Sequence, residues 1–202
     1  MLHLSTQKVL LRLEEQDHAE REAKLDVSVR LRQIPRATGE FLYLFLASHA
    51  QKYFPRFLGL EIGSSGGYST IWQGQALQAL GHGKLISLDI DPRKIRLAQE
   101  NIKEANCIKH LEVVQANAKD YLQRSPYQNF HYVFLDAEKE DYLQYYEMLV
   151  EKWLPKDAVI IADNVISHGE DLGDFLERVD NDDRVMNTTL PIGKGLSLIR
   201  RT

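Results

Sequence analysis

Two apolar segments of this chain end in side chains that could bind a metal ion. Residues 133–135 are followed by Asp136, and residues 159–162 by Asp163 and Asn164. If the two segments are neighbouring strands, their ends bring two carboxylates and an amide oxygen to one point. Oxygen ligands of this kind suit a hard divalent cation. The pattern therefore predicts a metal site.

An amine follows the first of these carboxylates. Lys139 lies three residues after Asp136, close enough to act as a base beside the cation. Structural explanations stay open on local grounds: Asp often caps a helix after a strand, and Asp-Asn is common turn chemistry. Lys139 also has acidic neighbours, which is typical of a solvated ion pair. Other parts of the sequence are needed to distinguish a metal site from these structural roles.

Composition limits the class of protein. A chain of 202 residues, 44% hydrophobic and 27% charged, fits one α/β domain, here residues 1–202 with 1–55 as an N-terminal helical cap. The net charge of −4 argues against a general nucleic-acid surface. The single Cys107 excludes an internal disulfide framework and favours a cytoplasmic location. The segment 1–25 mixes charged and apolar residues, unlike a signal peptide or a membrane span.

Strand and helix patterns alternate along most of the chain. Helices are expected before residue 55, the second one capped by Thr38. Strands are expected at 57–62, 84–90, 111–116, 131–135 and 158–162, with helices between them, and a hairpin at 184–190 and 196–200. This order predicts an α/β fold: a Rossmann-like, doubly wound, mostly parallel seven-stranded sheet with an antiparallel strand at its C-terminal edge, plus N-terminal helices.

A glycine-rich turn follows the first strand. Gly63, Gly66 and Gly67 precede a helix, an arrangement that lets the backbone approach a ligand. A dinucleotide fingerprint needs glycines at the spacing G-x-G-x-x-G. Counted from Gly63, the other two positions hold Ser65 and Tyr68. A dinucleotide is therefore not indicated, although a nucleoside ligand remains compatible.

The next strand supplies an acidic partner for that loop. Asp89 at its end could accept both hydroxyl protons of a ribose. Asp91 precedes Pro92 and is better explained as a turn or helix N-cap residue. The third strand continues into small residues and Asn117, which could border a flat adenine ring or form a turn into a short helix.

Four ordered motifs resemble a known family. They extend collinearly from about residue 34 to the C-terminus and resemble the cation-dependent S-adenosylmethionine (SAM) O-methyltransferases, the group of caffeoyl-CoA and catechol O-methyltransferases. The motifs are Leu60-Glu61-Ile62-Gly63 with Gly67-Tyr68-Ser69-Thr70, Phe134 to Tyr142, Asp163-Asn164-Val165, and Leu190-Pro191-Ile192-Gly193 with Gly195-Leu196.

The resemblance implies a cofactor site for SAM. By matching position, Glu61, the Gly63 turn and Ser69 bind its methionine part, Asp89 holds the ribose and Ala118 borders the adenine.

The resemblance also implies a metal site next to the cofactor. Asp136, Asp163 and Asn164 match the metal ligands, usually for Mg²⁺, with Ca²⁺ or Mn²⁺ as alternatives, and Asp136 borders both metal and cofactor. Lys139 falls where the catechol enzymes place their general base. Many relatives have an aromatic residue after the Asp-Asn pair. This chain has residues 165–169 there, without an aromatic residue of that kind. His168 in this segment could contact the acceptor, or it could be a solvated residue of a surface turn.

Three functions follow, in order of preference. The first is methyl transfer to a hydroxyl of a small aromatic, catechol-like acceptor, by a homodimer as in many relatives. The second is methylation of a hydroxylated wobble uridine in tRNA. The third is a non-catalytic SAM-binding module. The tRNA alternative depends on basic residues that could equally form a solvated helix face: Arg21, Lys24, Arg30, Arg32 and Arg36.

Overall fold

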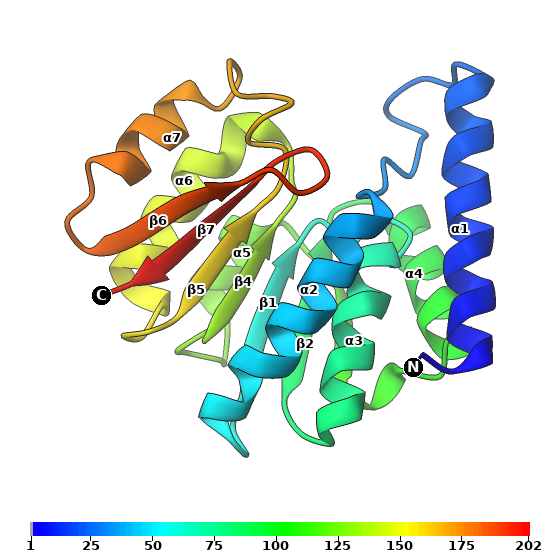
Figure 1. The fold of residues 1–202 in the computed structure, drawn as a ribbon, viewed down its shortest axis with the longest axis horizontal. Coiled ribbons are helices and arrows are strands. Elements are labelled where there is room, and N and C mark those ends of the chain that lie inside the picture. The colour runs from blue at the N-terminus through cyan, green and yellow to red at the C-terminus, as the bar shows by residue number, and fades with distance from the viewer. Residues whose placement is uncertain (1) are drawn as a thin grey trace.

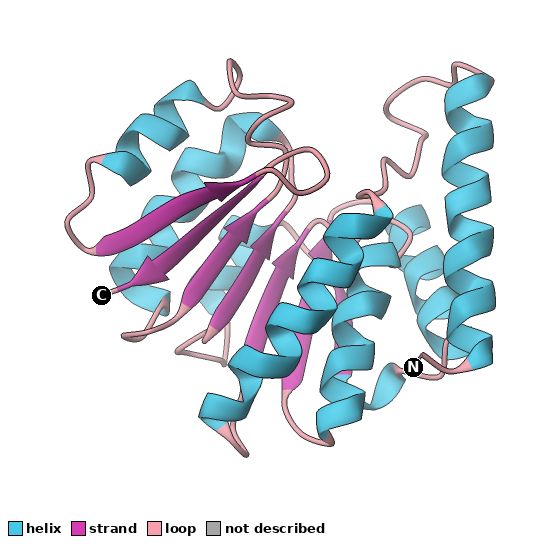
Figure 2. Cartoon of the chain, in the orientation of Figure 1, coloured by secondary structure: helices cyan, strands magenta, loops and turns pink. Residues whose placement is uncertain are grey.

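A single mixed sheet forms the centre of the computed structural model, which describes residues 2–202 (Figures 1 and 2). Its seven strands lie in the order β3-β2-β1-β4-β5-β7-β6, and the first five are parallel. The predicted Rossmann-like α/β fold is confirmed. The strands are β1 (Leu58–Ile62), β2 (Lys84–Asp89), β3 (Leu111–Gln115), β4 (Tyr132–Leu135), β5 (Val159–Ala162), β6 (Val185–Leu190) and β7 (Leu196–Arg201).

Helices cover both faces of the sheet, as crossover connections between parallel strands require. One hydrophobic cluster joins the sheet to α2 (Arg36–His49), α3 (Tyr68–Leu80) and α4 (Pro92–Glu104). The other joins it to α5 (Ala118–Arg124), α6 (Tyr142–Met148) and α7 (Gly173–Asp180). Shorter turns complete the chain: the 3₁₀ helices η1 (Ala50–Tyr53), η2 (Ile108–His110) and η3 (Lys139–Asp141), and the π-helical turn η4 (Leu149–Trp153).

The N-terminal helices differ in their packing. Leu42 and Leu46 of α2 are fully buried against the sheet layer. Helix α1 (Leu4–Glu22) instead packs along α3 and α4, with Val9, Leu10 and Leu13 buried (Figure 1). Among residues 2–202, no helix combines the length and apolarity needed to span a membrane.

Thr38 does not cap α2, contrary to the expectation from sequence. The helix begins at Arg36 with Pro35 at the N-cap position. Because proline fixes φ near the helical value, the chain enters the helix two residues before Thr38. Thr38 is fully buried, and a Cβ on Gly193 would collide with its hydroxyl. The threonine therefore marks a contact between α2 and the C-terminal hairpin.

The C-terminal hairpin forms as predicted, but the antiparallel strand is not at the edge of the sheet, where the sequence analysis expected it. Strand β7 pairs antiparallel with β5 on one side and with β6 on the other, so the antiparallel strand is interior and β6 forms the edge. The turn between them packs on the segment after β5, where Val165 N–H donates to Gly195 O at 3.1 Å. Gly195 has φ 93°, and a Cβ there would collide with Ile166. Glycine is thus required for this close approach.

Candidate active site

The carboxyl ends of the parallel strands meet at one edge of the sheet, where open α/β sheets bind ligands (Figure 1). The connections after β1 and β4 leave toward opposite faces, which opens a space between these two strand ends. All the residues predicted for the site lie at or behind this edge.

The glycine loop is held against β4. Gly63 has φ 106°, and a Cβ there would collide with the backbone carbonyl of Asp136. Its N–H donates to Leu88 O at 2.9 Å, while Asp136 N–H donates to Ile62 O at 3.0 Å. Because only glycine tolerates both the conformation and the contact, Gly63 fixes the distance between the loop and Asp136.

Helix α3 begins directly after the loop. Its N-cap is Gly67 in the left-handed conformation, φ 87°, and Ser69 in its first turn is 6% exposed. The free amides and dipole of a helix N-terminus favour an anion such as a carboxylate. Ser69 is therefore placed to support such a group with its hydroxyl.

A small cavity lies beside the loop. It is lined by the segment 63–66 with Tyr68 and Ser69, by the segment 32–34 from between α1 and α2, and by Asp136. The N-terminal segment therefore forms one wall of the space predicted for the cofactor.

Asp89 connects the loop to the end of β2. Its Oδ2 accepts the N–H of Ser65 at 2.8 Å and its Oδ1 accepts the N–H of Asp91 at 2.9 Å. Each carboxylate oxygen has a further lone pair, so ribose hydroxyls can still bind. Asp91 caps α4 by accepting the N–H of Arg93 at 2.8 Å, which confirms its predicted role.

Glu61 lies inside the protein. It is fully buried, and its carboxylate accepts hydrogen bonds from Thr70 Oγ1, Ser87 Oγ and Gln73 Nε2, the last at 2.7 Å. Burial raises its pKa. These contacts tie β1 to β2 and α3 and support the loop from behind. The predicted contact of Glu61 with methionine stays a prediction.

Ala118 is the first residue of α5. The side chain of Asn117 caps this helix by accepting the N–H of Lys119 at 2.9 Å. Ala118 is 2% exposed and its side chain packs in the core. The adenine contact predicted for it stays a prediction.

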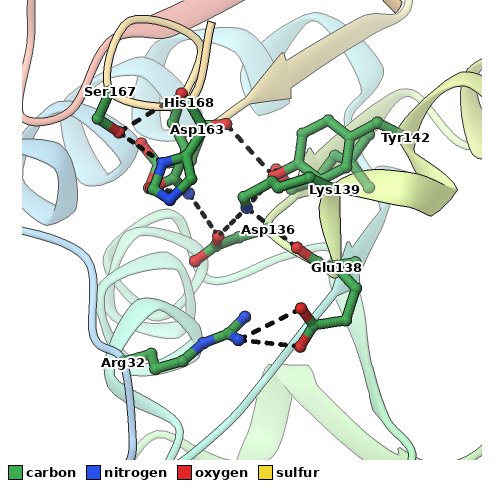
Figure 3. A network of polar contacts seen from close by, with 11 residues as sticks. Arg32, Asp136, Glu138, Lys139, Tyr142, Asp163, Ser167 and His168 are labelled. Atoms are coloured by element: carbon green, nitrogen blue, oxygen red, sulfur yellow. Dashed lines mark hydrogen bonds and ion pairs between the residues drawn. The ribbon is translucent and has the colours of Figure 1, made fainter. Parts of the chain in front are cut away.

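The three predicted metal ligands lie together (Figure 3). Asn164 Nδ2 donates to Asp136 Oδ1 at 2.9 Å and to Asp163 Oδ2 at 3.1 Å. Asn164 has φ 69°, a conformation that asparagine tolerates better than most residues. The left-handed turn aims its amide back at both carboxylates.

The surroundings of Asp163 fit a cation. Its Oδ1 is buried without a hydrogen-bond partner among the described residues. Burial, and then the charge of Asp136, raise the pKa of Asp163 well above its ordinary value. A divalent cation would remove this penalty, and rotating the Asn164 amide would present oxygen instead of nitrogen. Residues 2–202 contain no metal-type cluster of three His, Cys, Asp or Glu. A cation bound here would therefore need the Asn164 amide as a third protein ligand.

Lys139 reaches into the same place. Its Nζ donates to Tyr142 OH at 2.9 Å and to Ala137 O at 3.0 Å, and lies 3.5 Å from Asp136 Oδ1. Burial lowers the pKa of Lys139, although Asp136 and Asp163 oppose this shift. The amine therefore lies where a general base is expected.

Tyr142 is a site residue that the analysis of single residues missed. It is fully buried, and its hydroxyl lies 3.1 Å from Leu135 O and 3.3 Å from Asp163 O while accepting from Lys139. Burial raises its pKa well above the ordinary value, so it stays neutral. The signal was its position three residues after Lys139, a spacing that places two side chains on one helical face.

His168 lies at the open side of the site. It is exposed, its Nδ1 lies 2.9 Å from Ser167 Oγ, and its backbone N–H donates to Asn164 O at 2.9 Å. Figure 3 labels His168 in the same group of polar side chains as Asp136 and Asp163. The position is compatible with the predicted acceptor contact.

Comparison with known proteins identifies the family. A sequence model described as O-methyltransferase matches residues 14–202. The chain belongs to the O-methyltransferase family. The resemblance seen in the sequence is thereby confirmed. Among curated members, a catechol O-methyltransferase of Niastella koreensis is 35% identical over 114 residues, which is 55% of this chain and 50% of that protein.

Other members agree with this result. A catechol O-methyltransferase of Mycobacterium tuberculosis is 36% identical over 110 residues, 54% of this chain and 49% of that protein. The chain spans about half the length of these curated relatives. The crystal structure of the O-methyltransferase from Bacillus cereus in complex with SAH has a TM-score of 0.79 at 26% identity, covering 96% of this chain and 91% of the other.

Proposed function

We propose that this protein transfers the methyl group of SAM to a hydroxyl oxygen of a small aromatic, catechol-like acceptor, with the help of a divalent cation, Mg²⁺ by preference. One observation carries the proposal: Asp136, Asp163 and Asn164 converge beside Lys139, directly against the Gly63 loop. The family match and the relatives bound to SAH or SAM support the choice of methyl donor.

The cofactor would bind in the cavity beside the glycine loop. Ser69 and the first turn of α3 would hold the methionine carboxylate, and Asp89 would accept the ribose hydroxyls. Asp136 would border the reacting end of the methyl donor, and Glu61 would stiffen the loop from the interior. Ala118 would lie at the adenine edge.

The chemistry needs an acceptor oxygen that has lost its proton. A cation held by Asp136, Asp163 and Asn164 would stabilise the negative charge on that oxygen. Lys139 would take the proton at Nζ, for which its amine must be neutral. Burial favours the neutral amine, and Tyr142 fixes its position. The acceptor oxygen would then bond to the methyl carbon of SAM as the carbon–sulfur bond breaks, with S-adenosylhomocysteine as the leaving group.

The basic residues considered for tRNA give that alternative little support. Arg21 pairs with Asp17, and Arg32 pairs with Glu138. Arg36 pairs with both Glu14 and Glu40, so carboxylates already offset three of the five cations. A small acceptor therefore remains the preferred substrate.

The test uses labelled SAM with Mg²⁺ and either a panel of catechols or tRNA lacking the wobble modification. Label in a catechol, lost on adding a chelator, is the expected result. Label in tRNA alone would replace the acceptor assignment. Binding of SAM without transfer to any hydroxyl would reject the enzyme and leave a binding module.

A further inference from the structure

Arg32 is held in an unusual backbone conformation at the site. Its φ is 53°, in the left-handed region that long side chains rarely adopt. Both neighbours are fixed by α1: Leu31 N–H donates to Glu20 Oε2 at 2.8 Å, and Gln33 N–H donates to Asp17 Oδ1 at 3.3 Å. Strain that the surroundings impose in this way is often found at ligand-binding positions. Helix α1 thus sets the direction of the Arg32 side chain.

That direction is toward the segment that carries Asp136, Glu138 and Lys139. Arg32 lines the same cavity as Asp136, and Figure 3 shows its guanidinium below the Asp136 carboxylate, facing Glu138. Its positive charge also acts on Lys139 and on Tyr142. Arg32 therefore lies where the space proposed for the cofactor meets the proposed metal ligand Asp136, which is where an acceptor would receive the methyl group.

The partner that Arg32 now has is easily exchanged. Arg32 Nη1 lies 3.0 Å from Glu138 Oε1, but the Glu138 side chain is 65% exposed. Exposed ion pairs of this type contribute only about 0–1 kcal/mol. A carboxylate on a ligand can form two parallel hydrogen bonds with a guanidinium and take the place of Glu138.

Two carboxylates and a second cation are the other charged groups to consider near Arg32. Asp136 and Asp163 serve the proposed cation and Lys139. Lys194 is the second cation and lies in the turn between β6 and β7. Its backbone carbonyl accepts the N–H of Ile166, and its charge acts on Asp163. Arg32 differs from Lys194 in two ways: it lines the same cavity as Asp136, and its partner Glu138 is an exposed carboxylate.

We propose that Arg32 determines acceptor specificity by binding a carboxylate carried on the hydroxylated aromatic ring, in exchange for Glu138. The preferred acceptors are then catechol-type acids rather than neutral catechols. This inference rests on the proposed methyl transfer and concerns only the chemical class of its acceptor.

The experiment compares 3,4-dihydroxybenzoate with the uncharged 3,4-dihydroxybenzamide at saturating SAM and Mg²⁺. The measured quantity is the ratio of their kcat/KM values, because general losses of activity cancel in it. Wild type is expected to prefer the acid. Arg32→Gln should lower the ratio about tenfold to a hundredfold, as expected for a hydrogen-bonded charge. Glu138→Gln should raise it, since it removes the competing carboxylate.

Two further variants sharpen the result. Arg36→Gln, whose residue pairs with Glu14 and Glu40, should leave the ratio unchanged. Arg32→Lys should restore part of the preference, and unchanged binding of SAM to each variant shows that the fold is intact. A ratio that falls in Lys194→Gln but not in Arg32→Gln would overturn the inference.

The remaining outcomes separate this inference from the proposed function. Equal methylation of acid and amide by wild type rejects the role of Arg32 while the methyltransferase activity stands. Methylation of tRNA but of neither small acceptor rejects the inference together with the small-acceptor assignment. No methylation of any acceptor rejects the proposed function itself.

Discussion

Asn164 Nδ2 lies 2.9 Å from Asp136 Oδ1, although 28 residues separate the two in sequence. The pairing of β4 with β5 produces this contact, because Leu135 and Ala162 are register partners and each is followed by its acidic residue. The amide proton occupies a position between two carboxylates that suits a cation.

Loss of Asp163, a proposed metal ligand, should affect stability and activity in opposite directions. In Asp163→Asn, transfer should be abolished, while the free energy of unfolding without metal should rise, because a buried carboxylate beside Asp136 is removed. Wild type should gain about 2.7 kcal/mol at a Mg²⁺ concentration 100 times its Kd, and the variant nothing. Thermal unfolding with Mg²⁺ or a chelator measures both. The exposed Asp171→Asn is the control, and a metal-induced shift retained in Asp163→Asn contradicts the site.

Replacing Lys139 should remove the base without removing the cofactor. Lys139→Met should lower kcat about 10²- to 10⁴-fold, the usual contribution of a general base, with the Kd for SAM unchanged. Lys139→Arg should not restore activity, since arginine stays protonated. Single-turnover transfer and calorimetric SAM binding check this. A kcat for Lys139→Met equal to that of wild type at every pH would exclude the base role.

Replacing Gly63 should be costly because an added Cβ would collide with a neighbouring group. A second glycine of positive φ, without such a neighbour, separates this collision from backbone strain. Gly81 also has positive φ, 75°, but has no atom within 4 Å of an added Cβ. Gly81→Ala should cost about 1–2 kcal/mol of stability from backbone strain alone. Gly63→Ala adds the collision with the Asp136 carbonyl, so it should cost about 1–3 kcal/mol more and weaken SAM binding. Equal losses in denaturant unfolding would show that the close approach is unimportant.

His49 should make the fold sensitive to acid. It is 5% exposed, and its Nε2 lies 2.9 Å from His131 O. Burial lowers its pKa below the ordinary 6.5. The unfolded chain therefore binds a proton first as pH falls through about 6.5, so the free energy of unfolding should fall by up to about 1.4 kcal/mol per pH unit. The stabilising contribution of the neutral His49 side chain should be fully present above pH 6.5.

A titration of unfolding free energy between pH 8 and pH 5 tests this. In His49→Gln the decline should be shallower, since glutamine can still donate to His131 O but does not titrate. His18→Gln, which changes an exposed histidine, should keep the wild-type slope. Identical slopes in all three proteins would rule out His49 as the group responsible.

The sheet and the strand-end residues could be predicted because both depend on local patterns. Strands β4 and β5 are short apolar runs directly followed by Asp136 and Asp163, and Asp89 is the last residue of β2. Parallel pairing then leaves little freedom in where the carboxylates meet. The family could be recognised because its four motifs are short sequence patterns that occur in the same order in this chain.

Other features depend on tertiary contacts that have no local pattern. The interior place of β7 follows from pairing with both β5 and β6, while a hairpin pattern specifies only one of these neighbours. The burial of Glu61 follows from donors on β2 and α3. The strained Arg32 is imposed by carboxylates of α1, which no spacing rule connects to it.

The interior position of β7 also constrains how the protein acquires its structure. Until residues 196–201 are available, β5 has one unpaired edge, and an exposed edge of apolar residues is a site for association with other chains. Because β7 is the last strand in sequence order, the sheet closes only when the end of the domain has been synthesised. We therefore expect partly synthesised chains of this protein to depend strongly on chaperones. The dependence should be weaker for a protein in which the last strand to be synthesised lies at the edge of the sheet.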